Sequence, residues 1–479
     1  MDQIKILSSQ SSIILILILC TTFLIIGVLY SKKYLGIKNY LLANRKVETF
    51  SLTSSFVASA LGAWILFGPA SAATWGGIGS IIGYSLGAAF PLFILIFLGE
   101  KFRKKYPSCR TLIEVIRIKF KRKLFKIILF LSIFYMTIFL IAEVTAVSLL
   151  INYISGTDLW ITSLIIISTS LGYTLYGGLR ASIYTDNIQF LAMIILLSVA
   201  FYYIIYSGSE NYSFEFVNKI NPNLLSTGYL PNITAGLTFF IAVAATNLFH
   251  QGNWQRVYAA KSSKILKKSL FISFLIIIPI VFFMGFTGLV AISENQEVIP
   301  DLAFFYILLK EQVLIISILI IILAISLTVS SIDTLINAIS SLIIVDGNSI
   351  FKSKGNYFKY SKYIIIILSL IAFIVSSKGF SILYLFLLAD LLCCSAVLTV
   401  FFSFYKKSIN QSNASLSIII GLFFGLMFFP SPDFSKSILI GFLLPSDIFP
   451  EFLSQSLLFS SFFLATFAPL LAWKINKMI

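Results

Sequence analysis

The sequence predicts an all-α, polytopic membrane protein with about 13 transmembrane helices. Three observations lead to this fold class. Of the 479 residues, 58% are hydrophobic and only 11% are charged. Apolar stretches long enough to cross a bilayer follow one another along the chain, and Lys and Arg cluster between them. No linker or soluble domain interrupts the series, so residues 1–479 are predicted to form one membrane domain.

The predicted spans are apolar stretches of about 20 residues, the length that crosses about 30 Å of hydrocarbon. They lie at 11–30, 50–75, 76–98, 124–151, 158–176, 185–206, 232–252, 268–292, 312–345, 362–377, 381–403, 415–430 and 455–473. The stretch 312–345 is too long for one perpendicular span, so it should tilt or extend beyond the bilayer. No small-residue cleavage site follows the first stretch, so Ile13–Tyr30 is predicted to be retained. Three prolines mark 431–455 as an external loop at the interface.

Charges in the loops predict the orientation of the chain. Basic residues follow every second span, at 32–46, 101–123, 180, 261–268, 352–362 and 406–407. The alternate loops, at 210–215, 294–301 and 433–451, are acidic. Short basic loops face the cytoplasm. We therefore expect a cytoplasmic-membrane protein with its N-terminus outside and its C-terminus, with Lys474 and Lys477, inside.

The same distribution excludes other classes of protein. The net charge of +16 lies in these short loops, and no soluble basic segment with interleaved aromatic residues occurs, so nucleic-acid binding is not expected. The four cysteines lack metal-ligand spacing, so neither a zinc site nor a disulfide is predicted. The sequence does not indicate an oligomeric state.

Two predicted spans contain residues that interrupt a helix. In 50–75, Gly62, Gly68 and Pro69 fall at mid-depth, and a proline there removes a backbone donor. A helix break within the hydrocarbon is tolerated where a bound polar species or a water-filled cavity satisfies the freed backbone carbonyls and amides. The alternative interpretation is a proline kink without a bound ligand. The second span, 232–252, has polar residues crowded into its later half.

The two interrupted spans lie five spans apart, which predicts a five-helix inverted repeat. The first repeat is expected at 50–206 and the second at 232–403. The helix at 11–30 precedes them, and two peripheral helices at 415–473 follow. One central site is expected between the two breaks.

Placing an ionisable side chain inside a membrane span costs at least about 2.5–3.5 kcal/mol of free energy, so each such residue is expected to have a structural or functional role. Glu143 is interpreted mainly as an internal anchor, with a binding role as the alternative. For Asp390, a role in the solute pocket or ion path and a structural role are equally open. His250, the only histidine, is expected to be a packing residue.

A run of hydroxyl residues at 327–334 has two interpretations. Ser330 and Ser331, together with carbonyls freed at a helix break, offer the oxygen ligands that a hard monovalent cation prefers. Such hydroxyls also bond to carbonyls of their own helix or join neighbouring helices.

Four motifs, in order and spacing, resemble those of the sodium/solute symporter family, and the similarity covers nearly the whole chain. They are SALGAWILFGPA at 59–70, YGGLRASIYTDNIQ at 176–189, QGNWQRVYAAK at 251–261, and SSIDT at 330–334 with a following Asp346. The family's members carry proline, sugars, pantothenate, urea and monocarboxylates. The resemblance implies the inverted-repeat fold of leucine-transporter-like carriers.

The resemblance also implies a site. Its sodium ligands would be the carbonyls of Ala58, Leu61 and Leu327 and the hydroxyls of Ser330 and Ser331. Asp186 corresponds to the acidic residue near the inner sodium path, and Asp333 would support a second ion or orient the site. The solute would contact Gly62, Ala63, Trp64, Thr246, Asn247 and Asp390. Proline carriers have Asp where this chain has Ala60 and an aromatic residue where it has Asn247, so proline itself is in doubt.

These observations predict a sodium-coupled symporter, not an enzyme, that imports a small polar organic solute such as an amino acid, urea or a carboxylate. It needs no organic cofactor, and sodium is the coupling ion. Its other partner is the lipid bilayer. Two alternatives are a proton-coupled carrier in which Asp390 or Glu143 titrates, and a membrane sensor that has kept the transporter fold. The short C-terminus after Trp473 argues against the sensor.

Overall fold

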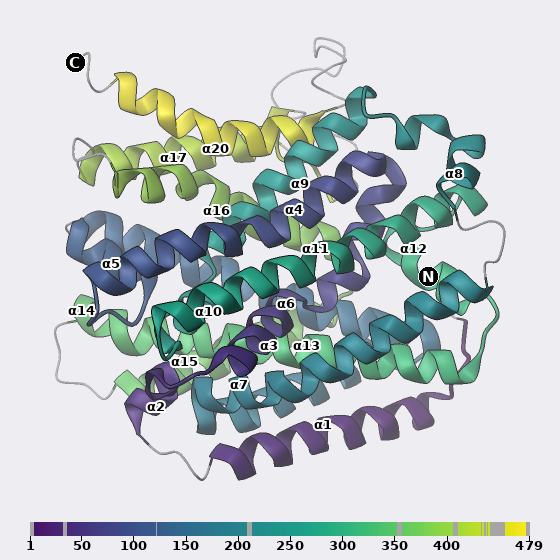
Figure 1. Cartoon of the computed structure of the whole chain (residues 1–479), viewed down its shortest axis with the longest axis horizontal. Helices are drawn as coiled ribbons and strands as arrows, with labels where there is room; N and C mark the ends of the chain where they lie inside the picture. Colours follow the sequence, from purple (N-terminus) through teal and green to yellow (C-terminus); the bar gives the residue numbers. More distant parts are fainter. Residues whose placement is uncertain are drawn as a thin grey trace.

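The structure, a computed structural model, describes residues 4–31, 36–120, 122–207, 213–351, 357–405, 411–432, 434, 437, 439–440 and 456–475. Nearly all of these residues are helical, and no β-strand occurs among them. The long helices are α1 (Ser9–Ser31), α4 (Gly68–Lys105), α6 (Arg122–Ser155), α7 (Leu159–Ser207), α9 (Leu230–Phe249), α11 (Ser263–Glu294), α13 (Leu314–Leu342), α15 (Tyr357–Ser376), α16 (Ile382–Ser403), α17 (Gln411–Phe428) and α20 (Leu457–Ile475). They lie side by side along one direction (Figure 1).

Shorter helices lie at the two ends of this bundle or interrupt its spans. They are α2 (Ile37–Leu42), η1 (Ala43–Arg45), α3 (Thr49–Ala60), η2 (Ala63–Leu66), α5 (Leu112–Lys119), α8 (Phe214–Ile220), η3 (Pro222–Leu225), α10 (Gln251–Ala259), η4 (Pro300–Leu302), α12 (Ala303–Leu309), η5 (Ile343–Gly347) and α14 (Asn348–Phe351). In Figure 1, α5 and α14 lie at the end opposite α8 and α12.

The all-α membrane fold is confirmed, but the count of about 13 spans is not. In the part of the chain that the structure describes, nine helices are long and apolar enough to cross a membrane, and three shorter apolar helices accompany them. Part of the difference arises at two glycines. The backbones of Gly77 (φ 52°, ψ −153°) in α4 and Gly178 (φ 60°, ψ −151°) in α7 are not helical, so each glycine separates two helices, and the predicted spans 158–176 and 185–206 both lie within α7 apart from Asp158. Both φ values are ones that glycine adopts readily.

The first break is confirmed within 50–75. Helix α3 ends at Ala60, and Leu61 (φ −97°, ψ 84°) and Gly62 (φ −84°, ψ −173°) are not helical. The short η2 follows, and α4 begins at Gly68 with Pro69 in its first turn. Proline fits there because the first amides of a helix have no intrahelical acceptor.

The second break is confirmed at His250 (φ −57°, ψ 108°), which separates α9 from α10. Two side chains of α10 satisfy carbonyls freed there. Trp254 Nε1 donates to the Leu248 carbonyl at 2.8 Å, and Asn253 Nδ2 donates to the Asn247 carbonyl at 3.0 Å. The break is therefore supported by the residues that follow it.

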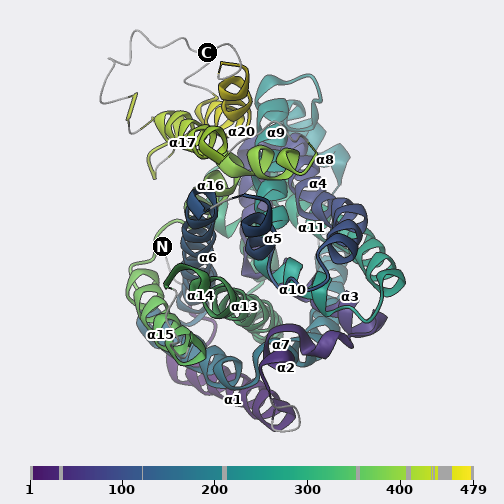
Figure 2. The ribbon, with the colours of Figure 1, turned by 90° about the vertical axis from the view of Figure 1, so that its left-hand side faces the viewer.

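The packing places the two broken helices inside the bundle. Helix α3 packs against α7, α11 and α13, and α9 packs against α4 and α16. Looking along the bundle, Figure 2 shows α17 and α20 at one edge, next to α16, and α1 at the opposite edge, beside α7. The division into repeats stays a prediction. Most of the loop predicted at 431–455 lies outside the described residues.

Candidate substrate and ion site

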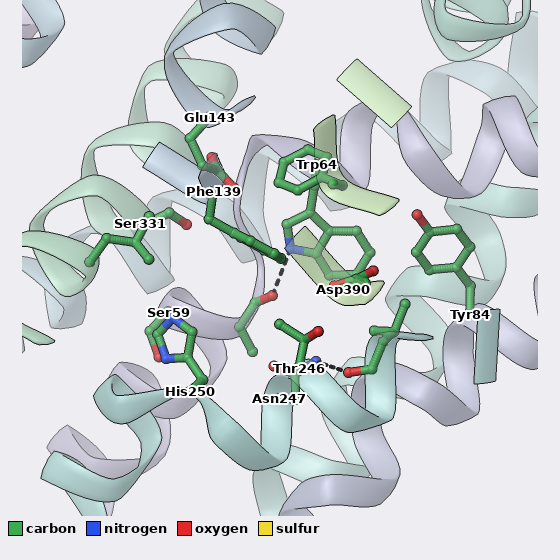
Figure 3. A pocket seen from close by; sticks show the side chains of 14 residues that line it. Ser59, Trp64, Tyr84, Phe139, Glu143, Thr246, Asn247, His250, Ser331 and Asp390 are labelled. Atoms are coloured by element: carbon green, nitrogen blue, oxygen red, sulfur yellow. Dashed lines mark hydrogen bonds between the residues drawn. The ribbon is translucent and has the colours of Figure 1, made fainter. Parts of the chain in front are cut away.

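A cavity of about 50 Å³ lies between the two breaks (Figure 3). Aromatic side chains from four helical segments, Trp64, Tyr84, Phe139 and Phe386, form much of its wall. Two carboxylates, Glu143 and Asp390, also face it. The cavity therefore combines apolar rings with two buried carboxyl groups.

Four of the six predicted solute residues line this cavity: Trp64, Thr246, Asn247 and Asp390. The other two, Gly62 and Ala63, do not line it. A Cβ atom on Gly62 would lie 2.1 Å from Glu143 Oε1 and 2.6 Å from Ser331 Oγ, so this glycine lies directly against two side chains that line the cavity.

Glu143 holds the first break in place. Its carboxylate accepts hydrogen bonds from the backbone amides of Ala63, at 2.8 Å, and Trp64. These amides begin η2 and have no acceptor within their own helix. Glu143 is only 1% exposed. It is thus both the internal anchor that the sequence suggested and a lining residue, which the set of predicted site residues omitted.

The second acid, Asp390, has fewer partners. The Thr246 hydroxyl donates to it, which joins α9 to α16 across the cavity. No ion pair among the described residues involves Asp390 or Glu143. His250, expected to be a packing residue, is buried and lines the same cavity.

The predicted sodium ligands lie around the first break and on α13. Ala58, Leu61 and Leu327 are fully buried. No hydrogen bond between described residues ends on the carbonyl of Ala58 or Leu61 at the break. The hydroxyl of Ser331 lies beside Gly62 and lines the cavity. Two backbone oxygens and one hydroxyl are therefore available where α3 and α13 meet.

Ser330 has a different partner. Its hydroxyl donates to Asp186 Oδ1 at 2.6 Å. The other carboxylate oxygen of Asp186 accepts from the Ser55 hydroxyl and from Arg256 Nη2, at 2.9 Å. Both charged side chains are fully buried. Asp186, predicted on the ion path, thus contacts a predicted sodium ligand directly.

Arg256 was missed as a site residue, although its motif was recognised. It donates to Ser55 Oγ at 2.7 Å and to Thr334 Oγ1 at 2.9 Å, besides its ion pair with Asp186. These contacts join α3, α7, α10 and α13. The signal was an arginine in the motif at 251–261, just beyond the second interrupted span, where a charge near the membrane interior requires a partner.

Asp333 faces a separate group of hydroxyls on α7. It accepts from Tyr173 at 2.6 Å, Ser182 at 2.8 Å and Thr185 at 3.3 Å. Asp333 therefore ties α13 to α7, and its role for a second ion stays a prediction.

Two interrupted helices that meet at a buried polar cavity define a secondary membrane transporter. Residues 40–421 match the Sodium:solute symporter family, and the chain belongs to this family. The family consists of transporters, so the protein is not an enzyme.

Individual relatives agree on the class and differ in solute. The chain is 25% identical to Spermidine transporter DUR31 of Candida albicans over 438 residues, which cover 89% of this chain and 82% of that protein. It is 28% identical to Sodium/glucose cotransporter 4 of Danio rerio over 172 residues, which cover 34% of this chain and 25% of that protein.

Among solved structures, a Na⁺-coupled sialic acid symporter in an outward-open state matches with a TM-score of 0.73 and 18% identity, covering 98% of this chain and 97% of that one. Mhp1, a nucleobase-cation-symport-1 family transporter, matches with a TM-score of 0.57 and 12% identity, covering 93% and 96%. These identities establish the fold alone, which is the leucine-transporter-like fold predicted from the sequence.

Proposed function

We propose that the protein is a sodium-coupled symporter that imports a small organic amine across the cytoplasmic membrane. The observation that carries the solute class is the pair of buried carboxylates, Glu143 and Asp390, in a cavity walled by aromatic rings. Carboxylates and ring faces both attract an organic cation. The same carboxyl groups disfavour a carboxylate solute. Of the candidates from the sequence, an amino acid, urea or a carboxylate, the carboxylate is therefore the least suitable.

Asp390 is the proposed ammonium anchor. Glu143 already accepts two backbone amides, whereas Asp390 has one side-chain donor, Thr246. A buried charge without a partner is costly, so a cationic solute that pairs with Asp390 gains affinity. Trp64 and Tyr84 lie 5.6 Å apart as stacked rings on the same wall and would cover the hydrocarbon part of the solute.

The name of the Candida relative supports this solute class, because spermidine is an amine. An amino acid such as proline also carries an ammonium group and stays a candidate. Urea is neutral and has no group that would pair with Asp390. The amine class is therefore argued from the cavity, and the relative supports it independently.

Sodium is the proposed coupling ion. The carbonyls of Ala58, Leu61 and Leu327 and the hydroxyls of Ser330 and Ser331 form the proposed ligand set. Ser330 would have to exchange its bond to Asp186 for the ion, so sodium binding is linked to the Asp186–Arg256 pair. Because the ion would join α3 to α13 beside the solute cavity, both ligands favour the same arrangement of the break, and each raises the affinity of the other.

Release to the cytoplasm would then require Asp186 and Arg256 to separate. The pair lies fully buried beside Ser330. We propose that it closes the inner path while sodium and solute are bound. The orientation, with the N-terminus outside, follows from the loop charges.

Uptake into proteoliposomes tests this function. Labelled spermidine, proline, urea and acetate are compared with an inward sodium gradient and with potassium in its place. We expect sodium-driven uptake of an amine, blocked by excess unlabelled amine and not by acetate. Sodium-driven uptake of acetate or urea alone would overturn the solute class.

The same vesicles test the coupling ion and the alternatives. A proton gradient without sodium is applied at fixed membrane potential. Equal uptake under that gradient would overturn sodium coupling and support the proton-coupled carrier, in which Asp390 or Glu143 titrates. Absence of uptake of every solute would favour the membrane sensor.

A further inference from the structure

A polar cavity of about 260 Å³ lies at the end of the bundle that the loop charges assign to the cytoplasm. We call it the inner pocket. Its walls come from the end of α1 (Tyr30), from the turn before α3 (Lys46), from the start of α3 (Ser51) and from the second half of α7 (Arg180, Asn187). In Figure 2, α1, α2 and α7 lie together at this edge of the bundle. The inner pocket shares no lining residue with the central cavity.

The inner pocket is positively charged. Lys46 makes no ion pair in the part of the chain that the structure describes. Arg180 is half-buried and donates one of its five N–H groups to the Ala43 carbonyl at 3.3 Å. Glu48, the one acid among the described lining residues, pairs with Lys261 at 2.7 Å, which neutralises it. Lys46 and Arg180 therefore attract an anion.

Neutral donors accompany these two cations. Asn187 Nδ2 donates to Ser51 Oγ at 3.0 Å, and the proton of the Ser51 hydroxyl has no acceptor among the described residues. Tyr30 and Tyr184 stack with their ring centroids 3.7 Å apart, and both line the pocket. A lysine, an arginine and a hydroxyl donor together suit a phosphate group, whose oxygens accept several strong hydrogen bonds.

Exposed apolar side chains adjoin the inner pocket on three helices. Leu29 of α1, Phe50 of α3 and Ile188 of α7 each stand next to a lining residue in the sequence, and they are 61%, 56% and 37% exposed. In a membrane protein such side chains contact acyl chains. A phospholipid therefore satisfies both the polar pocket and its apolar surroundings, whereas a soluble phosphate satisfies the pocket alone. The cytoplasmic leaflet is also the one that carries anionic lipids.

We propose that the inner pocket binds the phosphate headgroup of an anionic phospholipid, with Lys46 and Arg180 as its charged partners and Ser51 as a further donor. The proposal does not depend on which solute is carried. It assigns a role to α1, which precedes the two predicted repeats and supplies one wall of the pocket.

The bound headgroup would join α3 to α7. Asn187 already links these helices, because it donates to Ser51 and its Oδ1 accepts from the Ser54 hydroxyl. The residue before it, Asp186, forms the buried pair with Arg256. A headgroup in contact with both helices therefore stabilises the arrangement in which α3 rests on α7 and that pair is closed.

Lipid binding to the purified full-length protein in a neutral detergent tests the proposal. Dioctanoyl phosphatidylglycerol is titrated, dioctanoyl phosphatidylcholine is the uncharged comparison, and bound lipid is counted by native mass spectrometry. We expect phosphatidylglycerol to bind in preference. Lys46→Gln should weaken its binding about fivefold, the loss expected for one basic residue beside an anionic lipid, and Lys46→Arg should preserve it. Lys46 is exposed, and thermal unfolding checks that each variant is folded.

Lys264→Gln is the matched control, because it removes an exposed lysine from a loop assigned to the same side and outside the pocket. It should leave phosphatidylglycerol binding unchanged. Equal losses in Lys46→Gln and Lys264→Gln, or equal binding of the two lipids, would overturn the site. Competition by sn-glycerol 3-phosphate at the concentrations at which the lipid binds would overturn the lipid assignment in favour of a soluble phosphate.

This proposal and the proposed function fail in distinguishable ways, because the lipid titration uses neither solute nor sodium. Sodium-driven amine uptake without preference for phosphatidylglycerol would leave the function and remove the lipid site. Lipid binding that depends on Lys46, without sodium-driven uptake, would leave the lipid site and remove the function.

Discussion

Replacing Gly62 with alanine should weaken sodium and solute binding together. The backbone of Gly62 (φ −84°, ψ −173°) is open to any residue, so the effect of Gly62→Ala is steric and not conformational. The added Cβ would lie 2.1 Å from Glu143 Oε1 and 2.6 Å from Ser331 Oγ. Both side chains would have to move.

The expected loss of binding free energy in Gly62→Ala depends on which group moves to make room for the added Cβ. If Glu143 turns aside, the amides of Ala63 and Trp64 lose a charged acceptor. Such hydrogen bonds contribute about 1.5–3 kcal/mol each. If the break shifts instead, overpacking costs about 1–3 kcal/mol. A loss of about 1–3 kcal/mol corresponds to about five- to 150-fold in affinity.

The assay is thermal stabilisation of purified protein by sodium and by spermidine, followed by uptake in proteoliposomes. A ligand that binds only the folded state raises the apparent stability, so the shift reports affinity. Gly228→Ala is the control, since nothing lies within 4 Å of its Cβ position. If Gly62→Ala bound both ligands as tightly as Gly228→Ala does, the proposed contact of the break with Glu143 and Ser331 would be refuted.

Two further predictions concern the ion and the inner pair. Ser331→Ala should raise the sodium concentration for half-maximal uptake by about tenfold, with solute preference unchanged, because one of about five oxygen ligands is lost; unchanged sodium dependence would remove Ser331 from the site. Arg256→Gln leaves the fully buried Asp186 without its cation, so the protein should lose about 3–5 kcal/mol of stability, measured by thermal unfolding, and a change below about 1 kcal/mol would contradict this pairing.

The two breaks and the acids that line the cavity could be predicted from the sequence because each departs from the apolar pattern of its own span. Glycine and proline in an apolar span predict an interruption, and an acid in such a span requires a partner. Local patterns therefore predicted the first break beside Gly62 and singled out Asp390, which lines the cavity.

Which side each residue faces was not accessible from the sequence. At the first break, the irregular backbone turns Trp64 into the cavity and leaves Gly62 behind it. The partner of Ser330 is Asp186, 144 positions away, and no periodicity predicts that contact. The stacking of Phe239 of α9 on Tyr84 of α4, with ring centroids 4.4 Å apart, likewise depends on how these two helices pack.

The ion pair of Asp186 and Arg256 has a consequence for how the carrier moves. Its hydrogen bonds reach α3, α7, α10 and α13 at once, through Ser55, Ser330 and Thr334. None of these helices can shift alone without leaving a buried charge or hydroxyl unpaired. Inner opening is therefore expected to be concerted, with a single relaxation rate rather than a succession of partial openings. Such all-or-none behaviour limits leakage, because no partly open form offers sodium a path without its solute.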